Sequence, residues 1–156
     1  MTWHTLARYM QSLDDSGELI RVSDPVDVEL EAGCIADRLV KRGGGAILFE
    51  QPRLPDGSIS DLPLAMNLFG TRDRTNHALG VKKPDEIGNR MVSLMKPDIG
   101  GIMKAPWTGI GLALEGMSMA PMKVRKGACQ QIVIRDPDVT KLPIPKTWPE
   151  DGGRYI

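Results

Sequence analysis

The chain has 156 residues with 20 basic and 20 acidic side chains, so its formal net charge is zero. This length fits one domain with a short extension of a second, and the balanced charge, without a dense basic stripe, argues against a nucleic-acid partner. No run reaches the roughly 20 apolar residues that span a bilayer, and the N-terminus contains acids, unlike a signal peptide. The two cysteines form no disulfide framework. We therefore expect a cytoplasmic protein without a membrane span.

A first amphipathic helix is predicted from Trp3 to Ser16. Four apolar residues recur there at the spacing that places them on one face of a helix: Leu6, Tyr9, Met10 and Leu13. Thr2 is the expected N-cap, and Gly17 can adopt the left-handed conformation that ends a helix.

A second amphipathic helix is predicted from about Val28 to Arg42. Its apolar residues again follow a helical spacing, and Asp27 stands where an N-cap is expected. Lys41 and Arg42 lie in the last turn, where cations are favoured. The run Gly43 to Gly45 then ends the helix.

Three short strands are predicted around these helices. They cover Glu18 to Val22, Ala46 to Phe49, and Leu62 to Met66, the last one despite Pro63. Pro55 to Gly57 supplies turn residues between the second and third strands. We therefore expect those two strands to be neighbours in one sheet.

The second half contains more Gly and Pro and yields fewer elements. Thr71 is expected to cap a short helix that ends near Gly80, and a further helix is predicted from Pro84 to Met95. Between residues 98 and 121 we expect only one helical turn, at Leu112 to Leu114. Gln130 to Ile134 is a strand candidate, and Pro137 to Ile156 is expected to run as extended chain along a surface.

These elements predict an α/β (α+β) fold, with a small mixed sheet packed by helices and an extended Pro-rich C-terminal tail. We expect the α/β domain to occupy residues 1–120.

The histidines and cysteines do not form a recognisable catalytic or metal site. His4 is interpreted as a surface residue of the first helical turn and His77 as a partly buried helix residue. Cys34 is expected to act as a small apolar residue on the second helix, and Cys129 as a packed strand residue. A nucleophilic cysteine needs a base or a cationic setting that lowers its pKa, and none is visible here.

Two glycine-containing segments raise the question of phosphate binding. The order at Gly43 to Gly45 is helix, glycines, strand, which is the reverse of a phosphate-binding loop, so a helix end is favoured. Gly70 to Arg74 is the better anion candidate, because a glycine precedes a helix N-terminus that carries arginine, although structural capping is still favoured. From the residues alone we predict no catalytic, cofactor-binding or metal-binding residue.

Several short segments, taken in order, resemble UbiD-type decarboxylases (3-octaprenyl-4-hydroxybenzoate carboxy-lyase-like enzymes). They extend over nearly the whole chain except Val81 to Pro121, and Gly127-Ala128-Cys129 departs slightly from the Gly-Pro-Cys usual in the family. The matching segments are Gly17 to Val22, Val26-Asp27, Leu30-Glu31, Ile35 to Arg38, Ala46 to Glu50, Asn67 to Arg74, Ala78 to Gly80, Cys129 to Gln131, Asp138-Val139, Leu142 to Pro145 and Trp148 to Gly153.

The resemblance implies a reversible, non-oxidative decarboxylation of an aromatic or α,β-unsaturated carboxylic acid. Loss of CO2 from an sp² carbon requires an electron sink, which in this family is prenylated FMN. A divalent metal, usually Mn²⁺, and a monovalent cation are implied for the complete enzyme, as is a homo-oligomer. No cofactor is expected to bind this segment alone.

The resemblance also implies that residues 121–156 form a connecting strand and an extended segment at the start of a flavin-binding split-barrel domain. The flavin contacts, the metal ligands and a Glu-Arg-Glu network lie downstream of the Trp-Pro-x-Asp block in this family, so no residue here is assigned to them. Asp151 to Tyr155 are candidates to approach the flavin edge. Two alternatives stay open: a stand-alone domain that binds a protein partner, and a catalyst that needs only these residues.

Overall fold

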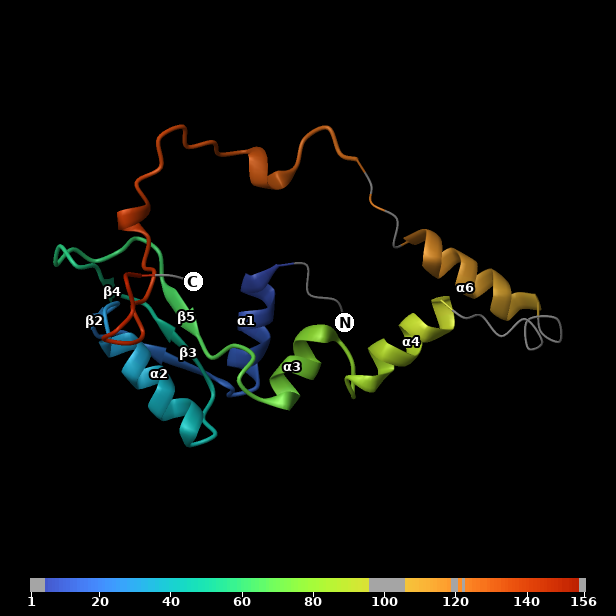
Figure 1. The fold of residues 1–156 in the computed structure, drawn as a ribbon, viewed down its shortest axis with the longest axis horizontal. Coiled ribbons are helices and arrows are strands. Elements are labelled where there is room, and N and C mark those ends of the chain that lie inside the picture. The colour runs from blue at the N-terminus through green and yellow to red at the C-terminus, as the bar shows by residue number, and fades with distance from the viewer. Residues whose placement is uncertain (1–4, 96–105, 119–120, 122, 155–156) are drawn as a thin grey trace. The chain divides into compact units, whose positions relative to one another are not determined.

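The computed structural model describes residues 5–95, 106–118, 121 and 123–154 (Figure 1). They fall into two compact units, one from Met1–Gly80 with Pro137–Ile156 and the other from Val81–Asp136. Within the described residues, no helix is long and apolar enough to span a bilayer.

The first unit is built on two small sheets. In the larger one, β1 (Leu19–Val22) pairs parallel with β3 (Ala46–Phe49), and β5 (Leu64–Met66) pairs antiparallel with β3 on its other side. In the smaller one, β2 (Val26–Asp27) pairs parallel with β4 (Pro52–Arg53). The expected mixed sheet and the pairing of the strands around the Pro55 to Gly57 turn are confirmed.

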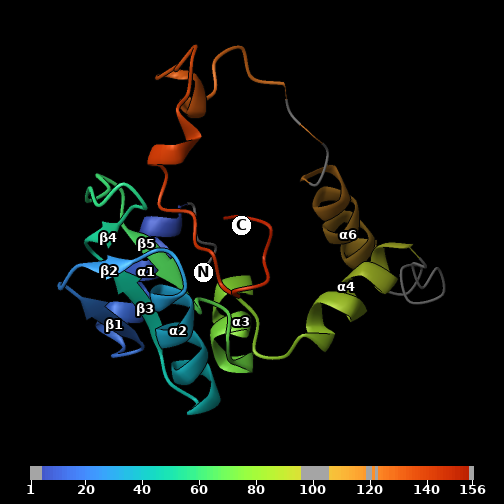
Figure 2. The same ribbon diagram turned by 60° about the vertical axis from the view of Figure 1, so that its left-hand side comes forward.

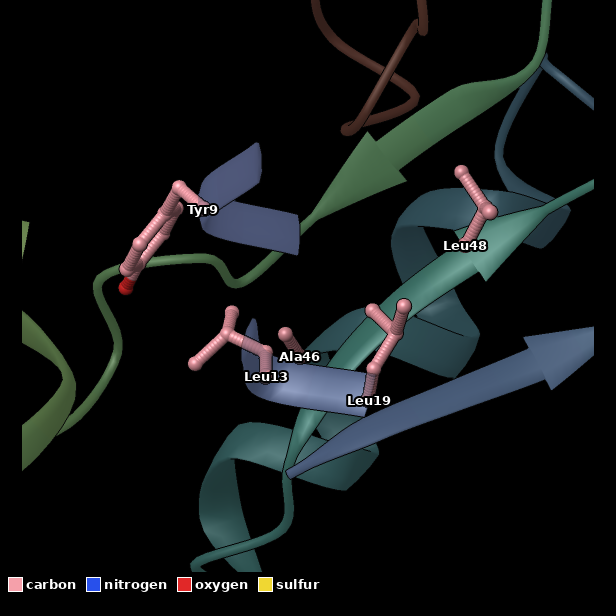
Figure 3. Close-up of a cluster of buried hydrophobic side chains, with 5 residues drawn as sticks. All are labelled: Tyr9, Leu13, Leu19, Ala46 and Leu48. Atoms are coloured by element: carbon pink, nitrogen blue, oxygen red, sulfur yellow. The ribbon is translucent and has the colours of Figure 1, made fainter. Parts of the chain in front are cut away.

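The central strand β3 is buried on both faces, which explains its uninterrupted apolar sequence. Ala46 and Leu48 pack with Tyr9 and Leu13 of α1 (Leu6–Asp15) and with Leu19 on one face (Figure 3).

On the opposite face, Ile47 and Phe49 of β3 pack against Val26, Ala32 and partly buried residues of α2 (Glu31–Lys41). Because side chains alternate along a strand, β3 joins the two clusters into one helix–sheet–helix core. Each large side chain buried in this way contributes about 1.5–3 kcal/mol of hydrophobic stabilisation.

Helix α1 starts later than the sequence suggested and ends where it was predicted to end. Thr5 is the N-cap, its hydroxyl oxygen accepting the Arg8 N–H at 3.2 Å, whereas the predicted cap Thr2 and the predicted first residue Trp3 lie outside the described residues. At the other end Gly17 has φ of +73°, and the Glu18 N–H reaches the Leu13 carbonyl at 2.8 Å. This is the Schellman arrangement that glycine favours.

Helix α2 also starts later, and the predicted N-cap at Asp27 is wrong. The backbone before residue 31 is paired with other strands: the Val28 N–H donates to the Arg53 carbonyl at 3.0 Å, and Asp27 lies in β2. A helix cannot begin where these groups already bond across a sheet. Gly43, with φ of +67°, ends the helix as expected.

Helix α3 (Arg72–Leu79) confirms the prediction at both ends. The Thr71 hydroxyl oxygen accepts the Arg74 N–H at 3.2 Å, and Gly80 adopts the left-handed conformation at the C-cap. The strand predicted from Leu62 is shorter than expected, because it starts only after Pro63, a residue without an N–H for the ladder.

The second unit contains α4 (Asp85–Met95), which matches its prediction closely, and α6 (Pro106–Ser118). The single turn expected at Leu112 to Leu114 is therefore wrong: these residues lie inside a helix of 13 residues. Three glycines inside α6 lower its helix propensity, which explains why the sequence did not predict this helix.

The strand predicted at Gln130 to Ile134 is also wrong. Ala128–Gln130 forms a 3₁₀ turn, and Ile132, Val133 and Ile134 are exposed with no strand assigned. A strand needs a partner to bond its backbone, and none lies beside these residues in the described part of the chain.

The C-terminal segment (residues 137–154) is mostly extended, as predicted, apart from a 3₁₀ turn at Val139–Lys141. It returns to the first unit, where Lys146 forms a parallel bridge with Glu29. In Figures 1 and 2 its red trace runs back beside the strands and α2.

Candidate functional site

The histidines and cysteines singled out in the sequence do not come together. His4 lies outside the described residues. His77 is exposed on α3, a correction of the partly buried position expected, and its Nε2 lies 3.0 Å from the Ser12 hydroxyl oxygen. Cys34 is on α2 as predicted but exposed, and Cys129 is exposed in a 3₁₀ turn instead of packed in a strand. Within the described ranges, no three His, Cys, Asp or Glu side chains are grouped to hold a metal.

The anion candidate at Gly70 to Arg74 is a structural support. Arg74 is only 3% exposed, and its guanidinium donates to Glu18 Oε2 at 2.8 Å and to the Gly44 carbonyl at 3.1 Å. The Arg74 carbonyl in turn accepts the Tyr9 hydroxyl at 3.1 Å. The arginine therefore joins α3 to the start of β1 and the end of α2, and its charge is directed inward, away from any external anion.

Gly44 and Gly45, just before β3, belong to the same contact region as Arg74 and Glu18. A Cβ on Gly45 would lie 2.6 Å from the Glu18 carbonyl oxygen, which already accepts the Ala46 N–H. The side-chain amide of Asn67 donates to the Gly45 carbonyl at 2.8 Å, and Asn67 itself has a backbone φ of +57°. The interpretation of Gly43 to Gly45 as a helix end is confirmed, and the run has the further role of allowing β1 and β3 to approach.

The most specific arrangement outside the core is the site at which the C-terminal segment docks. The Leu30 N–H donates to the Lys146 carbonyl at 2.7 Å, and the Lys146 N–H donates to the Val28 carbonyl at 3.0 Å. One residue further on, Thr147 lies against Gly33, a buried residue of α2. We call Val28, Leu30 and Gly33 the docking site.

Leu30 is held in a strained turn at this docking site. Its φ is +67° and its ψ is −42°, and the Glu31 N–H bonds to the Glu29 carbonyl at 2.8 Å, which makes a γ-turn with positive φ at its centre. Such a conformation costs a residue other than glycine about 1–3 kcal/mol and persists only where its surroundings impose it. Here the turn directs the Leu30 N–H to Lys146.

Beyond the docking site, the C-terminal segment is closed on itself by polar contacts. The Trp148 N–H donates to Asp151 Oδ2 at 2.8 Å, and the Arg154 guanidinium donates to the Thr140 carbonyl at 3.1 Å and the Leu142 carbonyl at 3.3 Å. Residues 140–154 therefore form a loop whose two ends are joined through Arg154.

A pocket of about 410 Å³ lies beside the docking site. Among its charged side chains, Arg53 pairs with Asp27 at 3.1 Å, and Glu29 is a second acid in the lining. The nearby turn is held by Asp56, whose pKa is lowered mainly by a hydrogen bond from the Ser58 hydroxyl. The pocket is lined by Asp27, Glu29, Leu30, Arg53, Leu54, Pro55 and Gly57.

Sequence reasoning did not find the docking site. The available signal was Gly33, a glycine inside an otherwise amphipathic helix, which often marks a close approach of another backbone. Nothing in the local sequence indicated that the approaching backbone would be more than a hundred residues further along the chain.

Comparison with known proteins defines the class of protein to which this fold belongs. Residues 10–92 match the family model of the 3-octaprenyl-4-hydroxybenzoate carboxy-lyase N-terminal domain, and residues 122–156 match that of the Rift-related domain of the same enzyme. The first match covers more than half of the chain. The chain belongs to the UbiD carboxy-lyase family, as the order of its motifs predicted.

Two relatives illustrate the match. An uncharacterized protein of Archaeoglobus fulgidus is 40% identical over 156 residues, which are 100% of this chain and 31% of that protein. An evolved dimeric form of the UbiD-class enzyme HmfF from Pelotomaculum thermopropionicum, solved with prFMN, superposes with a TM-score of 0.66 at 20% identity over 99% of this chain and 30% of that one. The chain thus spans less than a third of either relative, and the structural likeness confirms the α/β fold.

Proposed function

We propose that these residues are the N-terminal portion of a non-oxidative carboxy-lyase that acts on an aromatic or α,β-unsaturated carboxylic acid through prenylated FMN. Family membership supports the reaction class, and the HmfF likeness supports the fold on which that class is built. In this proposal the complete enzyme also uses Mn²⁺ and a monovalent cation, and it is a cytoplasmic homo-oligomer.

We assign no flavin contact and no metal ligand to the described residues, so we derive no catalytic step from them. They contain no group of three metal-ligating side chains, and the buried arginine is committed to Glu18 and Gly44. We propose a structural role instead. The α/β domain of residues 1–120 supports the flavin-binding part, which begins within residues 121–156, and Asp151 to Tyr155 approach the flavin edge.

One observation carries this proposal. The stretch that matches the Rift-related domain includes the C-terminal segment, and that segment is hydrogen-bonded to the docking site of the α/β unit through Lys146. A segment that belongs to one family domain and is hydrogen-bonded to the other is suited to set how the two domains are attached.

The test compares the 156-residue chain with a polypeptide of the relatives' full length that contains it. Titrated with prenylated FMN and Mn²⁺, the short chain should show no saturable binding at micromolar concentration and release no CO2 from a panel of unsaturated acids. The long polypeptide should do both. Flavin binding or CO2 release by the short chain would contradict the structural role, and failure of the long one would contradict the carboxy-lyase assignment.

A stand-alone protein-interaction domain is the second candidate. It is favoured by exposed apolar residues on α6, where Trp107 is 74% exposed and Ile110 and Leu114 are each 62% exposed. Surfaces of this kind are typical of interaction sites. An inactive long polypeptide that still forms a stoichiometric complex with another protein through these residues would support this candidate over the carboxy-lyase.

A further inference from the structure

The contact between Gly33 and Thr147 shows that the C-terminal segment docks where a side chain is missing. A Cβ built on Gly33 would lie 3.1 Å from Thr147 Cα, 3.3 Å from its Cγ2 and 3.3 Å from its carbonyl oxygen. Two of these three atoms belong to the backbone, so a change of rotamer would not relieve the contact. Any larger residue at position 33 must displace the segment itself.

Hydrogen bonding one residue earlier fixes the segment at the same place. Lys146 is bonded through both its N–H and its carbonyl, to Val28 and to Leu30. Leu30 makes its bond from the strained γ-turn, and a strained backbone is retained only where neighbouring contacts over-determine it. Three features therefore hold the same two residues of the segment, Lys146 and Thr147. They are the space left by the missing Cβ of Gly33, the two hydrogen bonds of Lys146 and the strained turn at Leu30.

The remainder of the segment is tied to this contact. The Arg154 guanidinium reaches back to the Thr140 and Leu142 carbonyls, and Asp151 accepts the Trp148 N–H. Because Arg154 closes the loop, a displacement of Thr147 should also move the residues that follow it, up to Arg154.

We propose that Gly33 is a positioning residue: by leaving space for Thr147, it fixes the direction in which residues 148–154 continue from the docking site and so the placement of the flavin-binding part. This inference rests on the proposed function and adds to it a specific residue that touches neither substrate nor flavin.

The first measurement uses the 156-residue chain and follows amide exchange in three variants. Gly33→Leu should speed exchange of the Lys146 and Leu30 amides by about tenfold or more, while the β3 amides keep their protection. Lys146→Pro, which removes one docking bond without altering α2, should speed exchange at Leu30 similarly. Gly88→Ala on α4, where a Cβ would meet nothing within 4 Å, is the control and should change neither amide.

The second measurement uses the full-length enzyme loaded with prenylated FMN. Gly33→Leu and Lys146→Pro should each lower kcat by about 10- to 100-fold, as expected for a displaced reaction geometry, with an altered flavin absorbance spectrum in enzyme that stays folded at the assay temperature. Gly33→Ala should have a smaller effect, which Thr147→Ala partly reverses because it removes the Cγ2 contact. Gly88→Ala should have the kcat and the flavin spectrum of the wild type.

Two results would overturn the inference. One is unchanged exchange at Lys146 in Gly33→Leu, which would show that the segment does not need the space. The other is faster exchange of the Lys146 and Leu30 amides in Gly33→Leu together with a normal kcat and flavin spectrum. That result would show that the contact holds the segment without positioning the flavin-binding part, and it would leave the proposed function intact. A wild-type enzyme without flavin or turnover would instead overturn the proposed function, and the positioning role with it.

Discussion

At the scale of single residues, Arg74 shows how a charged side chain can be misread from sequence. It stands at a helix N-terminus after a glycine, a pattern that is compatible with anion binding. In the fold it is buried, and it bonds to the carboxylate of Glu18, just before β1, and to the carbonyl of Gly44, between α2 and β3. Burial of a guanidinium is favourable only with such partners, so its role is to join elements.

We expect Arg74→Leu to lower the free energy of unfolding by about 2 kcal/mol, because it removes two charge-assisted hydrogen bonds and leaves the Gly44 carbonyl poorly satisfied. The figure is moderate because Glu18 is half exposed and can be solvated. Urea denaturation followed by circular dichroism measures the change. Arg72→Leu, on the exposed side of the same helix, is the matched control and should stay within about 0.5 kcal/mol of the wild type.

At the scale of elements, the helix ends were easier to predict than the helix starts. Both α1 and α2 end at a glycine with positive φ, a requirement that can be read from sequence. Their starts depend on Thr5 and on the pairing of β2 with β4, and the second of these is a long-range contact. A local cap signal such as Asp27 is overridden when the backbone is already bonded across a sheet.

The same substitution should therefore have opposite effects at two glycines. Gly43→Ala is expected to destabilise by about 1–2 kcal/mol, because alanine is strained in the left-handed conformation at the end of α2. Gly88→Ala, inside α4 and with open space around its Cβ, should stabilise α4 by up to about 1 kcal/mol. Thermal and urea unfolding of the two variants compare them directly. A loss of stability at position 88 as large as that at position 43 would contradict the conformational explanation.

At the scale of the whole molecule, ionisation should limit stability at both ends of the pH range. Hydrogen bonds from Ser23, Ser58 and Thr140 lower the pKa of the Glu50, Asp56 and Asp138 carboxyls, respectively. Burial raises the pKa of the Tyr9 phenol above its ordinary value of 10.0. The folded state thus favours ionised carboxylates and a neutral phenol.

The sign of the pH dependence follows from these directions. The contribution of the carboxylates is complete above their unfolded pKa of about 4 and is lost as the pH falls through the lower folded pKa. The contribution of Tyr9 is complete below pH 10.0 and is lost as the pH rises through the higher folded pKa. Urea midpoints measured across the pH range should form a plateau that falls on both sides. Tyr9→Phe should flatten the alkaline side, and Ser58→Ala with Thr140→Ala the acid side; flanks unchanged in these variants would refute the assignment.

The family and most of the α/β elements could be predicted from the sequence. Strand β3 was recognisable because a strand buried on both faces is apolar throughout, and α4 because its helical spacing agrees with the acidic residues in its first turn. The segment order that indicated the UbiD family is likewise a property of the sequence alone. These features depend on residues that are neighbours along the chain.

Other features were decided only by the tertiary structure. Ile132 to Ile134 have strand-like side chains but no partner strand within the described residues, and Arg74 has its partners in two segments far from it in the sequence. The docking of Lys146 and Thr147 against Leu30 and Gly33 joins residues that are far apart in the sequence. Local propensity cannot encode such contacts, because their free energy arises only once the chain has folded and brought both sides together.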